Sequence, residues 1–199
     1  MNKKQFVISN NDSTGKIEEF EYISSSLYEE KKSKFYAYIF EITSVDNANS
    51  ILNAMKKHFK DARHVVYAYI LENEYYCSDD GEPAGTGGKA IFALLDKQKV
   101  INTLVVVVRY FGGILLGVGP LSRAYIKAVK IAEEKLQIVP YIKKSELKLK
   151  CEYSEESLLR NLLEKVEAKI ISKDYDEKVY YIVSVKDDEK DIFTKYITC

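Results

Sequence analysis

The architecture follows from residues 104–125, which read Leu104-Val-Val-Val-Val-Arg-Tyr-Phe-Gly-Gly-Ile-Leu-Leu-Gly-Val-Gly-Pro-Leu-Ser-Arg-Ala-Tyr125. The first five residues are aliphatic without a polar interruption, which predicts a strand buried on both faces. Glycines follow, and Pro120 then marks the first turn of a helix, where a missing backbone N–H costs nothing. The stretch therefore predicts a central strand that a glycine loop, residues 109–119, joins to a helix.

The glycine loop has two interpretations, and the residues alone leave both open. Glycines let backbone N–H groups approach a ligand closely, and a helix N-terminus favours anions, which predicts phosphate or nucleic-acid recognition. In the other interpretation the glycines serve only the packing of a strand-to-helix turn. No Gly-Lys-Ser/Thr closes the loop and no Gly-x-Gly-x-x-Gly opens the helix, so neither nucleotide-binding signature is present.

The helix after the loop is predicted to run from Leu121 to about Val139. Three basic residues at i, i+4 and i+7, Arg123, Lys127 and Lys130, form a line on its outer side. Such a line suits a phosphate backbone, although a solvated helix face has the same pattern. The residues that the sequence offers for anion or nucleic-acid binding are Arg109, Gly112, Gly113, Gly117, Gly119, Arg123 and Lys127.

A second loop-forming stretch is Cys77-Ser-Asp-Asp-Gly-Glu-Pro-Ala-Gly-Thr-Gly-Gly-Lys89. Its carboxylates, Asp79, Asp80 and Glu82, define an acidic loop that suits either a divalent cation or acid–base chemistry. The alternative is a turn network in which the aspartates accept backbone N–H groups. The spacing is not that of an EF-hand and no nucleophile–base pair is evident, so no catalytic residue and no metal is predicted. Arg63 and His64 are further candidates for the same cleft.

Composition narrows the classes of protein. The chain has 30 basic and 30 acidic residues, so no overall positive field announces nucleic-acid binding. Three widely spaced cysteines and two histidines make a zinc site improbable, and no cofactor is predicted. No apolar run reaches the roughly 20 residues of a membrane span. A reduced, cytoplasmic setting without membrane partners is the expectation, and the pattern leaves the oligomeric state open.

The pattern divides the chain at Pro140, because proline ends the preceding helix. Residues 1–19 are polar and are predicted to be a flexible segment. A helix capped by Ser44 is expected to run to about Phe59, followed by a strand from Val65 to Leu71. Residues 141–199 read as strand, helix, strand, strand, helix, which is the split β-α-β plan without its last strand. The resulting open sheet edge suits pairing with a protein partner.

Four runs in this order resemble the signatures of the IMPACT/YigZ family: Lys32-Ser-Lys-Phe35, Asp61-Ala-Arg-His64, Ser78-Asp-Asp-Gly-Glu-Pro-Ala-Gly-Thr86 and Val106-Val-Val-Arg-Tyr-Phe-Gly-Gly-Ile-Leu-Leu-Gly117. The resemblance implies an α+β protein with a ribosomal protein S5 domain 2-like Impact domain over residues 20–139. It also implies a ferredoxin-like C-terminal domain over residues 141–199, similar to a domain of elongation factor G. Two positions depart from the family pattern, since Pro120 replaces a common glycine and Val65 replaces a frequent second histidine. A paired-histidine site is therefore not expected.

The resemblance also directs the functional expectation. Eukaryotic members regulate translation under amino-acid starvation, but they carry an additional N-terminal interaction domain that the first 20 residues here are not expected to supply, so that role is not carried over. The glycine loop with Arg109 and Arg123, the basic line beyond it and a second domain of a type used on ribosomes lead us to expect a non-catalytic regulatory protein that binds RNA, the ribosome or translation factors. The alternative is an enzyme or phosphate-binding protein that uses the acidic loop and the glycine loop across one cleft. A third possibility is an adaptor that pairs through the unfinished C-terminal sheet.

Overall fold

The computed structural model describes residues 5–9, 15–134 and 136–198 of the 199-residue chain. The chain divides into two compact units, Met1–Tyr141 and Ile142–Cys199. Both units mix helices and strands, as the sequence predicts, and the division falls one residue after Pro140.

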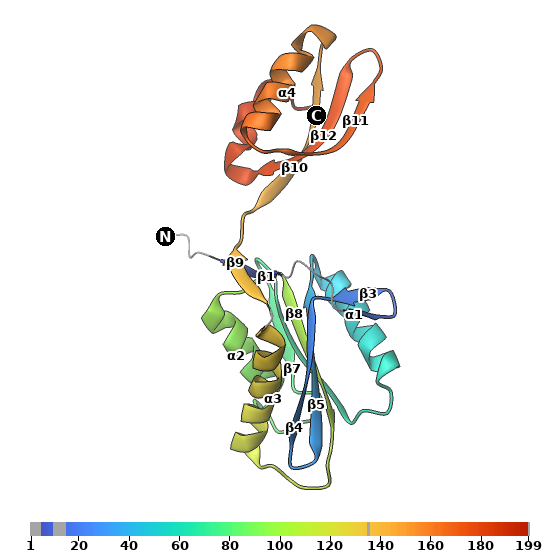
Figure 1. Ribbon diagram of the computed structural model, residues 1–199, viewed down its shortest axis with the longest axis vertical. Helices are drawn as coiled ribbons and strands as arrows, with labels where there is room; N and C mark the ends of the chain where they lie inside the picture. The colour runs from blue at the N-terminus through green and yellow to red at the C-terminus, as the bar shows by residue number, and fades with distance from the viewer. Residues whose placement is uncertain (1–4, 10–14, 135, 199) are drawn as a thin grey trace. The chain divides into compact units, whose positions relative to one another are not determined.

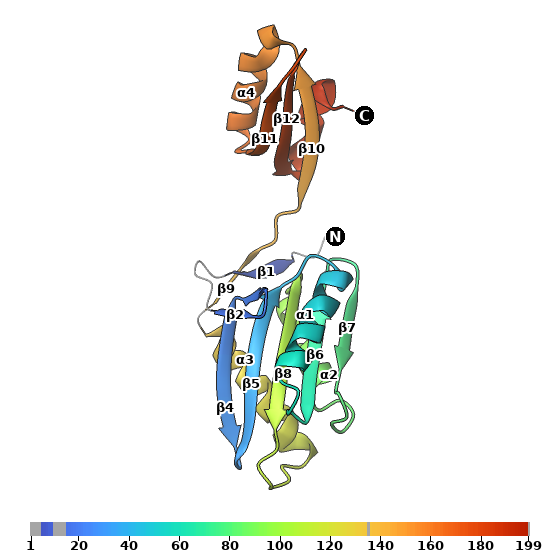
Figure 2. The ribbon, with the colours of Figure 1, turned by 90° about the vertical axis from the view of Figure 1, so that its right-hand side faces the viewer.

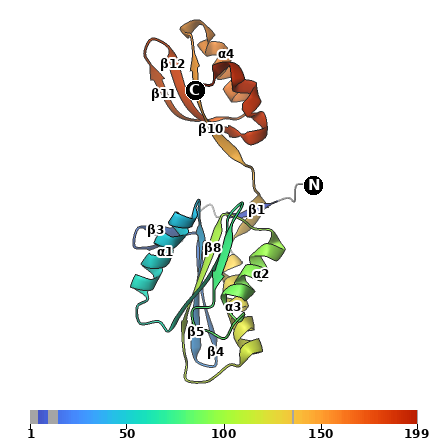
Figure 3. The same cartoon turned by 180° about the vertical axis from the view of Figure 1, so that it is seen from behind.

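The N-terminal unit is built on a five-stranded antiparallel sheet in the order β4-β5-β8-β6-β7, with β4 and β7 at its two edges (Figure 2). The strands are β4 (Ser24–Glu30), β5 (Ser33–Glu41), β6 (His64–Ile70), β7 (Tyr75–Ser78) and β8 (Thr103–Tyr110). Helix α1 (Val45–His58) covers one face, and helices α2 (Gly88–Gln98) and α3 (Val118–Glu133) cover the other (Figures 1 and 3). The sheet is thus the middle of three layers.

Strand β8 is the central strand, and its aliphatic run supplies both cores. Val105 and Val107 pack toward α2 and α3, whereas Leu104, Val106 and Val108 pack toward α1. Successive side chains of a strand point to opposite faces, so a strand between two helical layers needs apolar residues at every position. The predicted strand with two buried faces is confirmed.

The predicted α1 agrees with the structure to within one residue, whereas α3 differs at both ends and begins at Val118 instead of Leu121. Ser44 caps α1 as predicted, since its Oγ accepts a hydrogen bond from the N–H of Asn47 at 3.1 Å. The expectation that the third helix reaches Val139 is wrong, because α3 ends at Glu133 and β9 (Gln137–Pro140) follows it. Ile138 and Val139 instead pair with β1 (Phe6–Ser9), and this long-range pairing outweighs the helical spacing of the apolar residues.

The described part of residues 1–19 is ordered as strands, which corrects the predicted flexible segment. Strand β1 pairs with β9, and β2 (Gly15–Ile17) pairs with β3 (Phe20–Tyr22). Ile8 and Ile17 are each 4% exposed and belong to the two cores. Runs of three or four residues are too short to show a strand period, so only their partners reveal them.

The C-terminal unit folds in the predicted order of strand, helix, strand, strand and helical segment. Its sheet has the antiparallel order β10-β12-β11 and packs on α4. The elements are β10 (Lys144–Cys151), the 3₁₀ helix η1 (Tyr153–Glu155), α4 (Glu156–Lys165), β11 (Lys169–Tyr175), β12 (Val179–Lys186) and the 3₁₀ helix η2 (Asp187–Tyr196).

The edge of β10 that the sequence predicts to be open is partly occupied by the chain itself. Ile197 forms a bridge with Leu149, and the backbone N–H of Thr198 donates to the carbonyl oxygen of Lys148 at 2.9 Å. The adaptor hypothesis loses its main motivation, since part of the exposed edge is already paired.

Candidate functional site

The acidic loop and the glycine loop meet at one end of the central sheet. Antiparallel pairing sets His64, at the start of β6, opposite Arg109, near the end of β8. The acidic loop, which follows β7, and the glycine loop, which follows β8, enclose a cavity of about 240 Å³, which we call the loop pocket. It is lined by Arg63, His64, Gly81, Glu82, Pro83, Arg109, Phe111 and Leu115. The structure thus brings together the two segments that the sequence singled out.

Arg109 forms a buried ion pair instead of a free anion site. Its Nη1 lies 2.6 Å from Oε1 of Glu82, and the two side chains are only 6% and 4% exposed. The same Oε1 accepts a hydrogen bond from the Tyr125 hydroxyl at 2.6 Å. Burial and this hydrogen bond to Glu82 raise the pKa of Tyr125, which keeps the phenol protonated. The positive charge of Arg109, a predicted anion ligand, is therefore balanced within the protein.

The two aspartates of the acidic loop hold the loop together. Asp79 accepts the backbone N–H groups of Gly85 and Gly87 through its two carboxylate oxygens, at 2.7 and 2.9 Å. Asp80 accepts the N–H of Val65 at 2.6 Å. Of the two interpretations of the acidic loop, these bonds favour the turn network, because both carboxylates accept hydrogen bonds from backbone N–H groups. Across the described ranges, no group of three or more His, Cys, Asp or Glu side chains is placed to hold a metal ion.

The glycines of the glycine loop serve different purposes. Gly112 packs on the backbone of Lys32 and Ser33, and its N–H donates to the Ser33 hydroxyl at 3.1 Å. Gly113 and Gly117 have φ values of +85° and +80°, which few other residues adopt, and a side chain at either position would meet open space. Gly119 lies inside α3. Gly112, Gly113 and Gly117 thus determine the conformation of the glycine loop.

Sequence reasoning did not anticipate how much apolar surface the glycine loop exposes. Leu115 is 83% exposed, and Phe111, Ile114 and Val118 are exposed as well. A run of apolar residues between glycines looks like core in a sequence. Only the structure shows that Leu116 alone among Ile114, Leu115 and Leu116 points inward.

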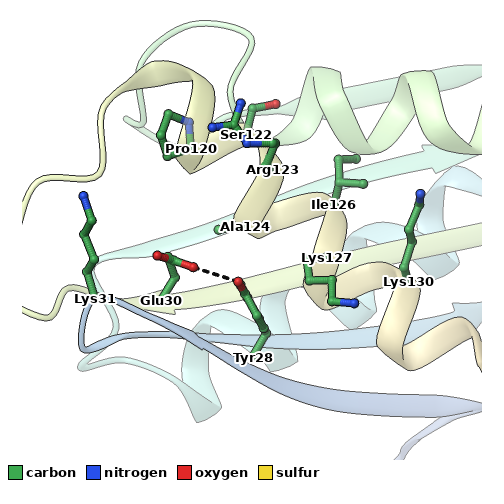
Figure 4. A pocket seen from close by; sticks show the side chains of 10 residues that line it. All are labelled: Tyr28, Glu30, Lys31, Pro120, Ser122, Arg123, Ala124, Ile126, Lys127 and Lys130. Carbon is green, nitrogen blue, oxygen red and sulfur yellow. Dashed lines mark hydrogen bonds between the residues drawn. The ribbon is translucent and has the colours of Figure 1, made fainter.

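The basic line of α3 lines a second cavity, the basic groove, between this helix and the end of β4 (Figure 4). The groove has a volume of about 640 Å³. Its positive side chains are Lys31, Arg123, Lys127 and Lys130, and the first of these comes from the β4–β5 turn. Within the described part of the chain, none of the four is in a salt bridge. The groove therefore combines four positive side chains with one carboxylate, Glu30, which forms no salt bridge with them among the described residues.

Lys31 was missed by the sequence reasoning, although its backbone marks it as unusual. Lys31 and Lys32 form the two-residue turn between β4 and β5, with φ values of +48° and +63°. Turns of this kind favour Asn-Gly because both residues need positive φ, and a lysine there is strained. Strain of this kind is often kept where the side chain has a function.

Comparison with known proteins finds two family models that match separate parts of the chain. Residues 31–132 match the Impact N-terminal domain, and residues 149–198 match a domain of unknown function, DUF1949. The chain is 31% identical over 182 residues to an IMPACT family member of Haemophilus influenzae, covering 88% of each chain. It is 36% identical over 160 residues to the IMPACT family member YigZ of Escherichia coli, covering 78% of each.

A solved structure supports the fold over most of the length. The crystal structure of a hypothetical protein is similar with a TM-score of 0.62 and 33% sequence identity, covering 86% of each chain. No described helix is long and apolar enough to cross a membrane. The two matched domains and the identities to relatives over most of their length show that the chain belongs to the IMPACT family.

Proposed function

We propose that this chain is a non-catalytic regulatory protein that acts on translation by binding RNA, free or in the ribosome, through the basic groove. The observation that carries the proposal is the group of four cations around one groove, none of which forms a salt bridge with a described residue. RNA binding by proteins depends mainly on cations that replace the counterions of the phosphate backbone. The regulatory role follows the family resemblance, and several relatives carry the name IMPACT.

The geometry of the groove suits a polyanion. Arg123 and Lys130 are seven residues apart on α3, so their backbones are separated by roughly 10 Å along the helix. Lys31 adds a cation from the opposite wall (Figure 4). Tyr28, Pro120 and Ile126 also line the groove, and an aromatic ring such as that of Tyr28 can stack with a nucleotide base. A single strand with successive phosphates would meet several cations at once.

The alternative of a phosphate-binding enzyme has less support. It requires Arg109 to bind the phosphate, whereas Glu82 already pairs with this guanidinium at 2.6 Å. It also requires free carboxylates at Asp79 and Asp80, which accept backbone N–H groups instead. Arg123 and Lys127, by contrast, are exposed and unpaired within the described residues, so they keep their predicted role in this proposal.

We also propose the finer fold types and the location that the sequence suggests. A ferredoxin-like type for the C-terminal unit is supported by the sheet order β10-β12-β11, in which the first and third strands are neighbours. The ribosomal protein S5 domain 2-like type for the N-terminal unit follows from the family resemblance. A cytoplasmic location is supported by Cys77 and Cys151, which are free thiols.

Reversing two charges of the groove tests the proposal. An Arg123→Glu, Lys127→Glu variant is expected to weaken binding to single-stranded RNA by roughly tenfold or more at low salt. The slope of log K against log salt should also fall by about 1.4, or about 0.7 for each lost phosphate contact. Fluorescence anisotropy with a labelled RNA at several salt concentrations measures both quantities.

The matched control reverses two exposed lysines on the opposite side of the sheet, Lys56 at the end of α1 and Lys60 just after it. A Lys56→Glu, Lys60→Glu variant has the same change in net charge and should bind RNA almost as the wild type does. Equal losses in both variants would show a nonspecific charge effect and would refute a groove-specific site. Failure of the wild-type protein to bind RNA or ribosomes at low salt would refute the proposal altogether.

The strained turn provides a second test, because stability and binding should move in opposite directions. Replacing Lys31 by asparagine and Lys32 by glycine puts the preferred residues at two positive-φ positions. The free energy of unfolding should rise by roughly 1 kcal/mol, as urea denaturation would show. RNA binding should weaken nonetheless, since one cation of the groove is lost. A variant that is more stable and binds RNA unchanged would exclude Lys31 from the site.

A further inference from the structure

The loop pocket holds two hydrogen-bond acceptors that the protein itself leaves unused. Oε1 of Glu82 accepts from Arg109 and Tyr125, but Oε2 accepts no hydrogen bond from any described residue. This oxygen is not among the atoms sealed from solvent, although the Glu82 side chain is only 4% exposed. Because solvent reaches this oxygen and no described residue donates to it, it is free to accept a donor that enters the pocket.

The second acceptor is Nε2 of His64. The Nδ1 atom of this ring lies 2.7 Å from the carbonyl oxygen of Asp80, and because a carbonyl only accepts, Nδ1 carries the proton. In the neutral ring Nε2 is therefore an acceptor, and it lies 3.8 Å from Oε1 of Glu82 without a hydrogen-bond donor of its own among the described residues. Two neighbouring acceptors fit a group with several N–H donors, such as an ammonium.

The rim of the loop pocket carries a positively charged donor, in contrast to the two acceptors inside. Arg63 is exposed, takes part in no salt bridge within the described residues, and lies over the Phe111 ring at 5.9 Å. Its guanidinium is free to bind a carboxylate. Pro83 and Leu115 add apolar wall. A volume of about 240 Å³ is smaller than that of pockets for drug-sized ligands, so the guest must be small.

We propose that the loop pocket binds a small zwitterion with a primary ammonium group and a carboxylate, which is the chemistry of an α-amino acid. The ammonium donates to Oε2 of Glu82 and Nε2 of His64, and the carboxylate accepts from Arg63. This site uses none of the residues of the basic groove, so it does not depend on the proposed RNA binding.

Three probes test the assignment without altering the protein. L-leucine carries both charged groups and an apolar branch that matches Pro83 and Leu115, whereas N-acetyl-L-leucine lacks the ammonium and L-leucinamide lacks the carboxylate. In an NMR titration with L-leucine, the amide chemical shifts of Gly81 and Gly113, one on each loop, should change. Both derivatives should bind at least about tenfold more weakly, since each loses a charged hydrogen bond. Equal binding of either derivative, or no response to millimolar L-leucine, would overturn the proposal and leave a cavity that holds only water.

Variants then test the named side chains. Arg63→Gln should weaken binding of L-leucine by about tenfold and leave L-leucinamide unaffected, because the amide never used the guanidinium. Lys60→Gln is the matched control, an exposed cation near Arg63 in sequence that does not line the pocket, and it should bind L-leucine like the wild type. The Arg123→Glu, Lys127→Glu variant should also retain L-leucine, even if RNA binding is lost. Loss of L-leucine binding in either of these two variants would contradict the assignment to the loop pocket.

Discussion

Replacing Arg109 by methionine is expected to lower the free energy of unfolding by about 3–5 kcal/mol, which is the typical cost of breaking a buried ion pair from one side. Methionine nearly fills the space of the arginine stem, so the loss comes mainly from charge. Among the described residues, the substitution leaves the Tyr125 hydroxyl as the one hydrogen-bond donor to the Glu82 carboxylate, which is 4% exposed. Urea denaturation followed by circular dichroism would measure the change.

A second substitution separates charge from packing. The double variant Arg109→Met, Glu82→Gln removes both charges, so it should regain a large part of the stability lost in the single variant. Arg63→Met is the control, because that guanidinium is exposed and unpaired within the described residues, and its loss should stay within about 0.5 kcal/mol. If the double variant is less stable than Arg109→Met, the idea that an orphaned carboxylate causes the loss is wrong.

Gly112→Ala should be the most disruptive of the glycine substitutions in the glycine loop. A Cβ at Gly112 would lie 2.1 Å from the carbonyl carbon of Lys32 and 2.3 Å from its oxygen, both of them backbone atoms. The β4–β5 turn would have to move away, which also strains the Ser33 hydrogen bond to the Gly112 N–H. We expect a loss of about 3 kcal/mol, at the upper end for overpacking, measurable as a lower urea midpoint.

Gly119→Ala is the matched comparison seven residues along the chain. There the nearest atom to an added Cβ is Nη1 of Arg123, at 3.4 Å, and this is the far end of a flexible side chain. Because Gly119 lies in α3, alanine should leave stability unchanged or raise it by up to about 1 kcal/mol. Equal losses at Gly112 and Gly119 would show that the close backbone contact is not what requires glycine at Gly112.

Both predictions concern contacts that join distant parts of the sequence. Arg109 meets Glu82 across 27 residues, and Tyr125 meets the same carboxylate across 43. Sequence patterns identified Arg109 and Glu82 as candidate site residues, but they predicted that Arg109 binds an anion from outside the protein. The sequence pattern of a charged residue at the end of a buried strand is the same whether the residue pairs with a ligand or with a neighbouring loop. Only the tertiary structure shows which partner lies beside it.

The basic groove shows the same division between sequence and structure. Helical spacing alone placed Arg123, Lys127 and Lys130 on one line, because the α-helix brings residues at i, i+4 and i+7 to one face. That Lys31 faces this line from a strained turn depends on the docking of α3 against β4 (Figure 4). No local period of the sequence encodes that docking.

What the sequence by itself determined is the part of the protein governed by local rules and by resemblance. These include the twice-buried strand β8, the Ser44 cap, the strand–helix order of the C-terminal unit and membership of the IMPACT family. Tertiary structure alone decided that α3 stops at Glu133, that residues 6–9 pair with β9, and that the acidic loop caps itself and leaves Glu82 Oε2 open to a pocket. The reason is physical, since periodicity and capping act within a few residues, whereas edge pairing, buried charge balance and cavities arise only when distant segments pack together.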